Sequence, residues 1–163
     1  VQLWGESLGK KQKNSAFNVG LTPIGLTGPK DQHSFLQLLT EGTRDKSVTF
    51  IKLKKFNNQE SIPSISLEHL EDLDLINDIK FSTLINLQEN SIFESLNVSQ
   101  RIPLDEITIQ KQDEFSIGQL IYYYELLTSL IGDLLNINTY NQPGVESGKQ
   151  ILIQKLKELK DKQ

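Results

Sequence analysis

The chain has 163 residues, with 17 Lys and Arg against 21 Asp and Glu, a net charge of -4 and no Cys. This length suits one domain, residues 1–163, and the acidic balance with scattered basic residues excludes nucleic acid as a partner. The missing cysteines exclude disulfides and thiolate zinc sites, and His33 and His69 lie too far apart to suggest a metal spacing, so metal-free chemistry is expected.

Polar residues interrupt the most hydrophobic stretch of the chain. Gln119, Glu125 and Asp133 leave no apolar run of transmembrane length, and no signal peptide opens the sequence. We therefore expect a cytoplasmic protein without a membrane contact. The chain starts at Val1 and contains no Met, which favours a fragment of a longer protein.

The first part of the chain predicts a helix end and then a strand. Residues 1–8, which include Glu6, fit the last turns of a helix that Gly9 closes in a left-handed conformation. A carboxylate at this position is unfavourable to the helix dipole and is usually a surface residue. Residues 17–28 mix apolar positions with Gly and Pro, typical of a short buried strand that runs into a glycine-rich turn.

A second helix follows, with Asp31 as its predicted cap and Gly42 at its end. His33 falls in the first turn of this predicted helix. The positive helix end disfavours imidazolium, so a neutral imidazole that can accept or relay a proton is expected there. The alternative is a histidine that caps the helix or packs under a loop.

The middle of the chain alternates strands and helices. Residues 48–53 and 102–109 predict strands from their β-branched and apolar content. Between them, residues 67–96 carry helical spacing twice, with a break near 77–80. This alternation predicts an α/β fold, a three-layer sandwich with a parallel sheet flanked by helices, whose ligand lies at the carboxyl ends of the strands.

Two more helices are predicted near the C-terminus. Ser116 to Gln119 has the capping-box pattern at the start of an apolar helix over 117–135. A second helix starts near Pro143, which suits a first turn, after Asn141, which can supply a capping oxygen. The apolar stripe of this last helix predicts that it docks on the rest of the chain.

The polar segment 138–149 at the start of that helix presents side chains rather than filling a core. Gln142 and Lys149 are seven residues apart, which places them on one helix face about 10 Å apart along the axis. An amide, a cation and free helix N–H groups are suited to an oxygen-rich anion. The alternative is that Lys149 pairs with Glu146, three residues earlier, on a solvated face.

Three segments together resemble one family in its chain order. They are Glu-Ser-Leu-Gly-Lys at 6–10, Gly-Pro-Lys-Asp-Gln-His-Ser-Phe-Leu-Gln at 28–37 and Tyr-Asn-Gln-Pro-Gly-Val-Glu-Ser-Gly-Lys at 140–149. The chain resembles the C-terminal sugar-isomerase (SIS) domain of phosphoglucose isomerases. The resemblance implies a SIS-type, flavodoxin-like fold and an aldose-ketose isomerase that interconverts glucose 6-phosphate and fructose 6-phosphate, without a cofactor.

The resemblance also implies a role for each candidate residue. Glu6 is the base that moves a proton between C1 and C2 through a cis-enediol, His33 and Lys149 carry protons during ring opening, and Gln142 holds the substrate. In the family the histidine reaches the site from the neighbouring subunit, which implies a homodimer. A glutamate base with a neutral histidine occurs in triosephosphate isomerase on another fold.

Two parts of the family pattern are missing from the sequence. The upstream Gly-Gly-Arg-aromatic-Ser motif, whose arginine stabilises the enediolate, is absent, and so is the Ser/Thr loop that grips the phosphate. We therefore expect the polypeptide alone to be inactive, as the catalytic half of an isomerase whose N-terminal half is missing. The alternative is a freestanding sugar-phosphate-binding regulatory or dimerisation module.

Overall fold

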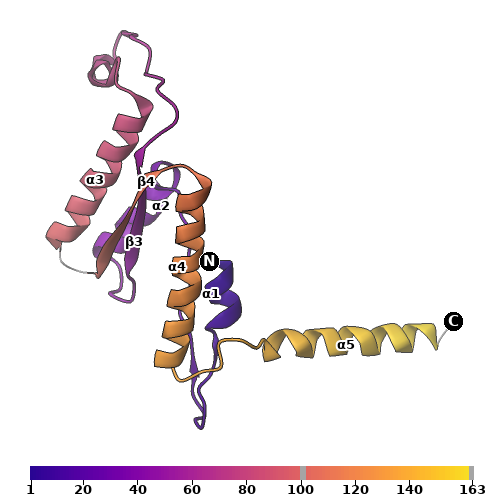
Figure 1. Ribbon diagram of the computed structural model, residues 1–163. Coiled ribbons are helices and arrows are strands. Elements are labelled where there is room, and N and C mark those ends of the chain that lie inside the picture. The colour runs from indigo at the N-terminus through magenta and orange to yellow at the C-terminus, as the bar shows by residue number, and fades with distance from the viewer. Residues whose placement is uncertain (100–101, 162–163) are drawn as a thin grey trace. The chain divides into compact units, whose positions relative to one another are not determined.

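The structure is a computed structural model that describes residues 1–99 and 102–161, and it divides into two compact units. We call Val1–Gly25 together with Leu120–Gln163 the terminal unit, and Leu26–Gln119 the central unit. Helix α4 (Glu114–Leu134) begins in the central unit and ends in the terminal unit. Figure 1 shows the elements of both units.

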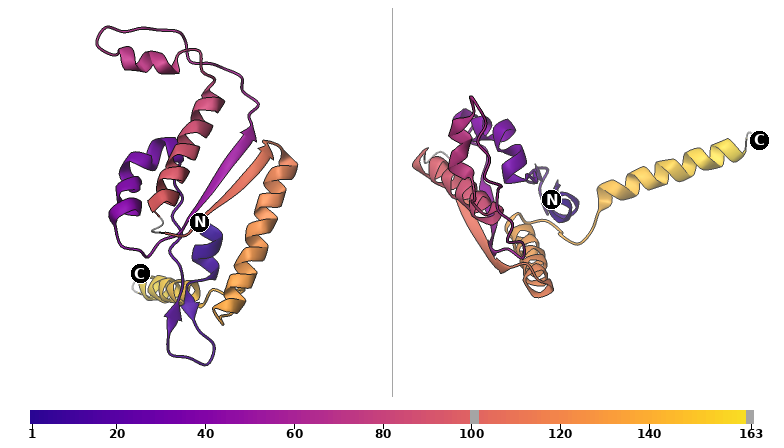
Figure 2. Two further views of the ribbon diagram at one scale, coloured as in Figure 1. Left: turned by 90° about the vertical axis from the view of Figure 1, so that its left-hand side faces the viewer. Right: turned by 90° about the horizontal axis from the view of Figure 1, so that it is seen from above.

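The central unit is built on a two-stranded parallel sheet. Strand β3 (Val48–Lys55) pairs with β4 (Leu104–Lys111) in a register that runs from Val48 opposite Leu104 to Lys55 opposite Lys111. Helix α3 (Phe81–Ser99) packs along the strands, and the Phe50 and Phe93 rings meet edge to face at 5.4 Å. Helix α2 (Gly28–Glu41) lies against α3 (Figure 2).

The expected α/β class, with a parallel sheet flanked by helices, is therefore confirmed. The arrangement is consistent with a three-layer sandwich. The two predicted strands exist, each with slightly different ends, because β-branched residues favour an extended backbone wherever a neighbouring strand can pair with them.

Helix starts in the central unit differ from the prediction. Helix α2 begins three residues before Asp31, at Gly28, with Thr27 as its N-cap. Asp31 instead reaches back, and its carboxylate accepts a hydrogen bond from the Thr27 N–H at 2.7 Å. His33 therefore lies in the second turn rather than the first. The predicted helix from Leu67 is only a short 3-10 helix, η1 (Glu71–Ile76), before the expected break.

The cap of α4 also differs from the predicted capping box. The Asp113 carboxylate accepts a hydrogen bond from the Ser116 N–H at 2.8 Å, so the helix starts at Glu114. The Lys111 ammonium, followed by the Ser116 side chain and the Ser116 N–H, lowers the pKa of Asp113 to about 2. A carboxylate is a better cap than a hydroxyl here because the helix dipole and Lys111 both favour its charge.

In the terminal unit, α1 (Gln2–Ser7) is followed by a small antiparallel ladder of β1 (Lys10–Lys11) and β2 (Asn18–Val19). The buried strand predicted over 17–28 is wrong, because only β2 is extended and Leu21 and Ile24 are 58% and 60% exposed. Pro23 cannot donate to a ladder, which limits pairing beyond β2.

The left-handed Gly9 was also predicted wrongly. Among the glycines of the described residues, Gly20 has a positive φ, 158°, and Gly9 does not. A Cβ on Gly20 would lie 2.9 Å from the Cα atom of Gly9. The two glycines therefore permit a close approach of two backbone segments rather than a helix-closing turn.

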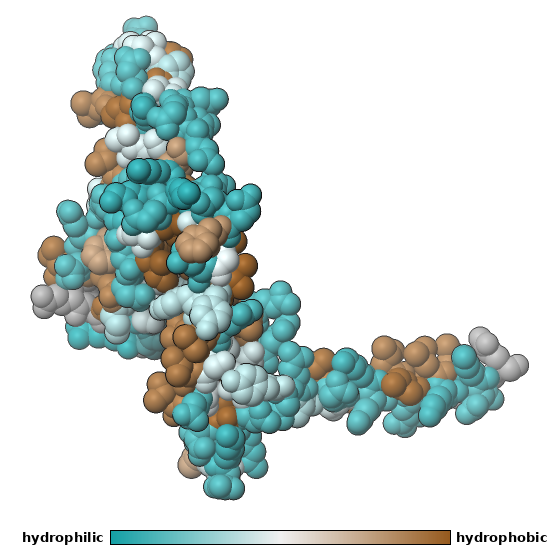
Figure 3. Space-filling model, viewed as in Figure 1, coloured by the Kyte–Doolittle hydropathy of each residue, from teal (hydrophilic) through white to brown (hydrophobic). Residues whose placement is uncertain are grey.

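Helix α5 (Pro143–Lys160) starts at the predicted proline, but Gln142 is its N-cap residue, without a side-chain capping bond, and Asn141 does not cap it. The predicted docking of α5 is wrong, because none of its residues is buried. Its apolar stripe, including Leu152 and Leu156, is half-exposed (Figure 3). Within the described part of the chain, no helix is long and apolar enough to cross a membrane.

Candidate active site

Two segments far apart in the sequence lie side by side in the terminal unit. The Gln142 side-chain amide donates a hydrogen bond to the Glu6 carboxylate at 3.3 Å. The Lys10 ammonium donates to the carbonyl oxygens of Asn138 at 2.6 Å and Thr139 at 3.1 Å. The segment that carries Glu6 is thus joined to the connection between α4 and α5 (Figure 1).

Two further residues extend this pairing. The Gln12 amide donates to the Leu135 carbonyl at 3.1 Å. Lys13 and Asn136 exchange two bonds, from the Lys13 N–H to the Asn136 carbonyl at 2.8 Å and from the Asn136 amide to the Lys13 carbonyl at 3.3 Å. The contacts run from Glu6 with Gln142 at one end to residues 12–13 with residues 135–136 at the other, so the segments run in opposite directions. We call residues 6–13 and 135–142 the paired segments.

The connection is anchored by burial as well as by hydrogen bonds. Ile137 is 2% exposed and Thr139 is 9% exposed. Thr139 packs against Gly132 of α4 so closely that a Cβ there would lie 1.8 Å from its hydroxyl oxygen. On the other segment, Leu8 is fully buried. Both segments therefore have fixed points within a few residues of Glu6 and Gln142.

Glu6 is an exposed carboxylate in the last turn of α1. One of its oxygens accepts from the Gln2 amide, one helical turn earlier, at 2.8 Å, and the other accepts from Gln142. Both donors are neutral, so the carboxylate is oriented by hydrogen bonds alone. A carboxylate held in this way can accept a proton from a substrate and return it.

Lys149 takes the alternative partner that its spacing allows. Its ammonium lies 2.8 Å from the Glu146 carboxylate, and the two side chains are 62% and 61% exposed. The structure therefore brings Glu6 and Gln142 together but pairs Lys149 with Glu146. An exposed pair of this kind contributes only about 0.3–0.5 kcal/mol, so the ammonium can leave it at little cost.

His33 belongs to the central unit, on the exposed side of α2. It lines an open cavity of about 410 Å³ between α2 and α3, with Gln32, Leu36, Gln37, Thr40 and Ile92. The cavity wall combines amides, a hydroxyl and two aliphatic side chains. His33 is thus displayed where a second molecule can reach it.

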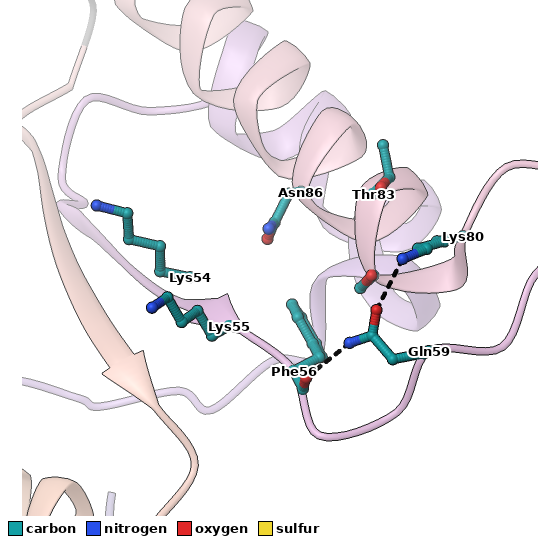
Figure 4. Close-up of a pocket in the computed structure, with 8 residues that line it drawn as sticks. Lys54, Lys55, Phe56, Gln59, Lys80, Thr83 and Asn86 are labelled. Atoms are coloured by element: carbon teal, nitrogen blue, oxygen red, sulfur yellow. Dashed lines mark hydrogen bonds between the residues drawn. The ribbon is translucent and has the colours of Figure 1, made fainter.

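A second open cavity of the central unit, about 380 Å³, lies at the carboxyl end of β3 (Figure 4). Lys54 and Lys55 line it, but their ammonium groups point away from its centre, as Figure 4 shows. The Lys80 ammonium is bound to Gln59 at 2.8 Å. The lysines do not converge on one point, so this cavity is a weaker candidate than the paired segments.

Sequence reasoning identified Glu6 and Gln142 but missed Gln2, Lys10 and Thr139. Lys10 is the last residue of the first family motif, and no local sequence pattern links it to the carbonyl oxygens of Asn138 and Thr139, 128 and 129 positions away. The described residues contain no group of three or more His, Cys, Asp or Glu side chains that could hold a metal ion.

Comparison with known proteins gives one consistent result. The family model for phosphoglucose isomerase matches residues 2–163. The glucose-6-phosphate isomerase of Campylobacter jejuni is 45% identical over 152 residues, which cover 93% of this chain and 36% of that protein. The glucose-6-phosphate isomerase of Methanocaldococcus jannaschii is 38% identical over 150 residues, which cover 92% of this chain and 34% of that protein.

A solved structure agrees. The chain is similar to a hypothetical protein from Thermus thermophilus, with a TM-score of 0.86, 29% identity and coverage of 96% of this chain and 37% of that one. The chain thus spans about a third of the length of the relatives it matches. Because the family pattern extends along almost all of its residues, the chain belongs to the phosphoglucose isomerase family.

Proposed function

We propose that this chain supplies the proton-transfer half of the active site of an aldose-ketose isomerase that converts glucose 6-phosphate to fructose 6-phosphate and back. The observation that carries the proposal is the hydrogen bond between Glu6 and Gln142, which joins a carboxylate and a substrate-binding amide from opposite ends of the chain. The named relatives are glucose-6-phosphate isomerases, and they support this substrate class.

In the proposed reaction, the Glu6 carboxylate removes the proton from C2 of the open-chain aldose. The electron pair of that C–H bond forms the C1–C2 double bond of a cis-enediol, while the carbonyl oxygen at C1 takes up a proton. Glu6 then returns its proton to C1, and the hydroxyl at C2 becomes the ketone as its proton leaves. Gln142, which donates to Glu6 in the structure, can hold a substrate hydroxyl beside the carboxylate.

Ring opening needs proton carriers at the ring oxygen and the anomeric hydroxyl. We assign these roles to His33 and Lys149. Lys149 is exposed and pairs with Glu146 only weakly, so it is free to turn toward a bound sugar. His33 is exposed on α2, which suits delivery to the active site of a second subunit in a homodimer.

The three family motifs of this chain do not supply every group that the isomerisation needs. A developing enediolate needs positive charge, and a phosphate needs a binding loop. We therefore expect the 163-residue polypeptide by itself to show no isomerase activity, and the product of the complete coding sequence to be active in the cytoplasm. Trp4, the single Trp, lets binding of fructose 6-phosphate to the short polypeptide be followed by fluorescence. Tight binding there would favour a freestanding sensor module.

The decisive experiment replaces Glu6 by Gln in the complete protein. Exchange of the substrate C2 proton with solvent and the isomerisation rate should both fall by roughly 10²- to 10⁴-fold, the usual contribution of a general base. Glu125→Gln is the matched control, since Glu125 is an exposed carboxylate of α4 in the same unit. Undiminished exchange in Glu6→Gln would remove Glu6 from the proposed role.

A further inference from the structure

Lys10 is the cation that joins the two paired segments. Its ammonium donates to two consecutive carbonyl oxygens, those of Asn138 and Thr139. Burial lowers the pKa of Lys10, which agrees with an ammonium partly withdrawn from water into this backbone site. Hydrogen bonds from a charged donor are shorter and about twice as strong as those between neutral groups. Lys10 is thus a strong point of attachment between the segments.

On both paired segments, the Lys10 contact lies only a few residues from the candidate site residue. Glu6 lies four residues before Lys10, and Gln142 lies three residues after Thr139. Between Glu6 and Lys10 the chain is fixed by the fully buried Leu8, and the other segment is fixed by the 9% exposed Thr139. Lys10 therefore supplies a direct contact between the fixed part of one segment and the fixed part of the other, close to both Glu6 and Gln142.

The backbone near Lys10 is built for this close approach. Gly9 and Gly20 allow the backbone just before β1 to lie against the backbone just after β2, where a Cβ on Gly20 would meet the Gly9 Cα at 2.9 Å. Lys10 itself pairs with Val19 in the β1–β2 ladder. The Lys10 backbone is therefore held by the ladder, which leaves its side chain to reach the carbonyls of the connection.

We propose that Lys10 is a positioning residue for the isomerisation: its ammonium holds the connection so that the Gln142 amide stays at the Glu6 carboxylate. This inference rests on the proposed function of Glu6 and Gln142. Lys10 acts through Gln142 and does not touch the substrate. Misplacement of a reacting group by about 1 Å can cost on the order of 10²-fold in rate, so a residue of this kind affects kcat.

The test is a double-mutant cycle in the complete protein, with Lys10→Met, Gln142→Ala and the double variant. Met keeps most of the aliphatic stem of Lys10 but removes the donors. We expect Lys10→Met to lower kcat by roughly 10- to 100-fold. In the Gln142→Ala background the same change should have almost no further effect, because residues that act through one another are not additive.

Two further variants separate positioning from general stability. Lys11→Met removes the same charge one residue later, from the other face of β1, and should leave kcat unchanged. Lys10→Arg retains a positive charge and N–H donors for both carbonyls, so it should recover most of the kcat that Lys10→Met loses. If Lys10→Met fails to fold, the kcat of Lys10→Arg still tests the proposal. Thermal melting of each variant shows whether the protein is folded at the assay temperature.

Several outcomes would overturn the inference. In the first, the losses of kcat in Lys10→Met and Gln142→Ala multiply in the double variant. In the second, Lys10→Met has the same kcat as Lys11→Met. In the third, Lys10→Arg is folded but as slow as Lys10→Met. Failure of the proposed function looks different, because Glu6→Gln would then retain full isomerisation. If Glu6→Gln is inactive while the cycle is additive, only the role of Lys10 is wrong.

Discussion

The central and terminal units are held together in different ways. In the central unit, the strands form a regular ladder, and α3 contacts them through side chains such as Phe93 and Glu89. In the terminal unit, the key contacts are hydrogen bonds between residues 123 to 136 positions apart. The comparison teaches that repetitive packing builds the scaffold, whereas a few long-range polar contacts build the candidate site.

The largest expected effects come from one fully buried leucine in each unit, Leu8 and Leu96. Leu8→Ala and Leu96→Ala should each lower the free energy of unfolding of the complete protein by about 2–5 kcal/mol in urea titration. Leu8→Ala should also lower kcat, since Leu8 fixes the segment that carries Glu6. Equal kcat for the two folded variants would contradict the division of roles between the units.

A pair of glycines in α4 tests the close packing of the connection. Gly132→Ala places a Cβ against Thr139 and should destabilise the protein by about 1–3 kcal/mol, as overpacking does, with a loss of kcat. Gly118→Ala is the control, because nothing lies within 4 Å of its Cβ. It should stabilise the helix by up to about 1 kcal/mol. Similar melting temperatures for the two variants would show that Thr139 moves away freely.

A charge network in the central unit gives the third prediction. Lys52 lies 2.7 Å from Glu106 of β4 and 3.5 Å from Glu89 of α3. The side chains of Lys52 and Glu89 are partly covered, and Glu106 stands at an exposed position. Lys52→Met leaves two carboxylates without their cation and should cost about 1–3 kcal/mol at pH 7. Lys54→Met, at an exposed position of the same strand, should cost far less.

The effect of Lys52→Met should depend on pH with a definite sign. The hydrogen bond between the two groups lowers the pKa of Glu106 below 4.5 and raises the pKa of Lys52 above 10.5. The stabilisation is therefore present between these values. It is lost as pH falls through the lowered pKa of Glu106 and as pH rises through the raised pKa of Lys52. Urea titrations at pH 7 and pH 3 should show a smaller difference between wild type and variant at pH 3.

The smallest expected effect concerns the start of α4. Asp113→Ala removes the observed cap and should lower the melting temperature measurably, whereas Ser116→Ala should have little effect. Because the pKa of Asp113 is lowered to about 2, this contribution persists in mild acid and is lost only as pH falls toward 2. If Ser116→Ala lowered the melting temperature more than Asp113→Ala, Ser116 would be the cap, as the sequence pattern predicted.

Local patterns predicted the central unit well because its elements are stabilised by the residues that define them. The strands at 48–55 and 104–111 follow from β-branched content, and α3 follows from its apolar spacing. The patterns failed at helix caps, because Asp31 accepts from the N–H of the cap residue Thr27 and Asp113 accepts from the Ser116 N–H, instead of Asp31 and Ser116 each starting a helix. They also failed for α5, since an apolar stripe indicates that a helix can dock but does not identify its partner.

The sequence by itself determined the chemical groups of the candidate site and their family motif, including Glu6, His33, Gln142 and Lys149. Helical spacing offered Glu146 as a partner for Lys149, and the structure has that pair. Tertiary structure alone decided that Gln142 meets Glu6 and that Lys10 joins the two segments. Helical spacing constrains only residues within a few turns of one another. A contact across more than a hundred residues depends on how buried side chains such as Leu8 and Thr139 fix the backbone between them.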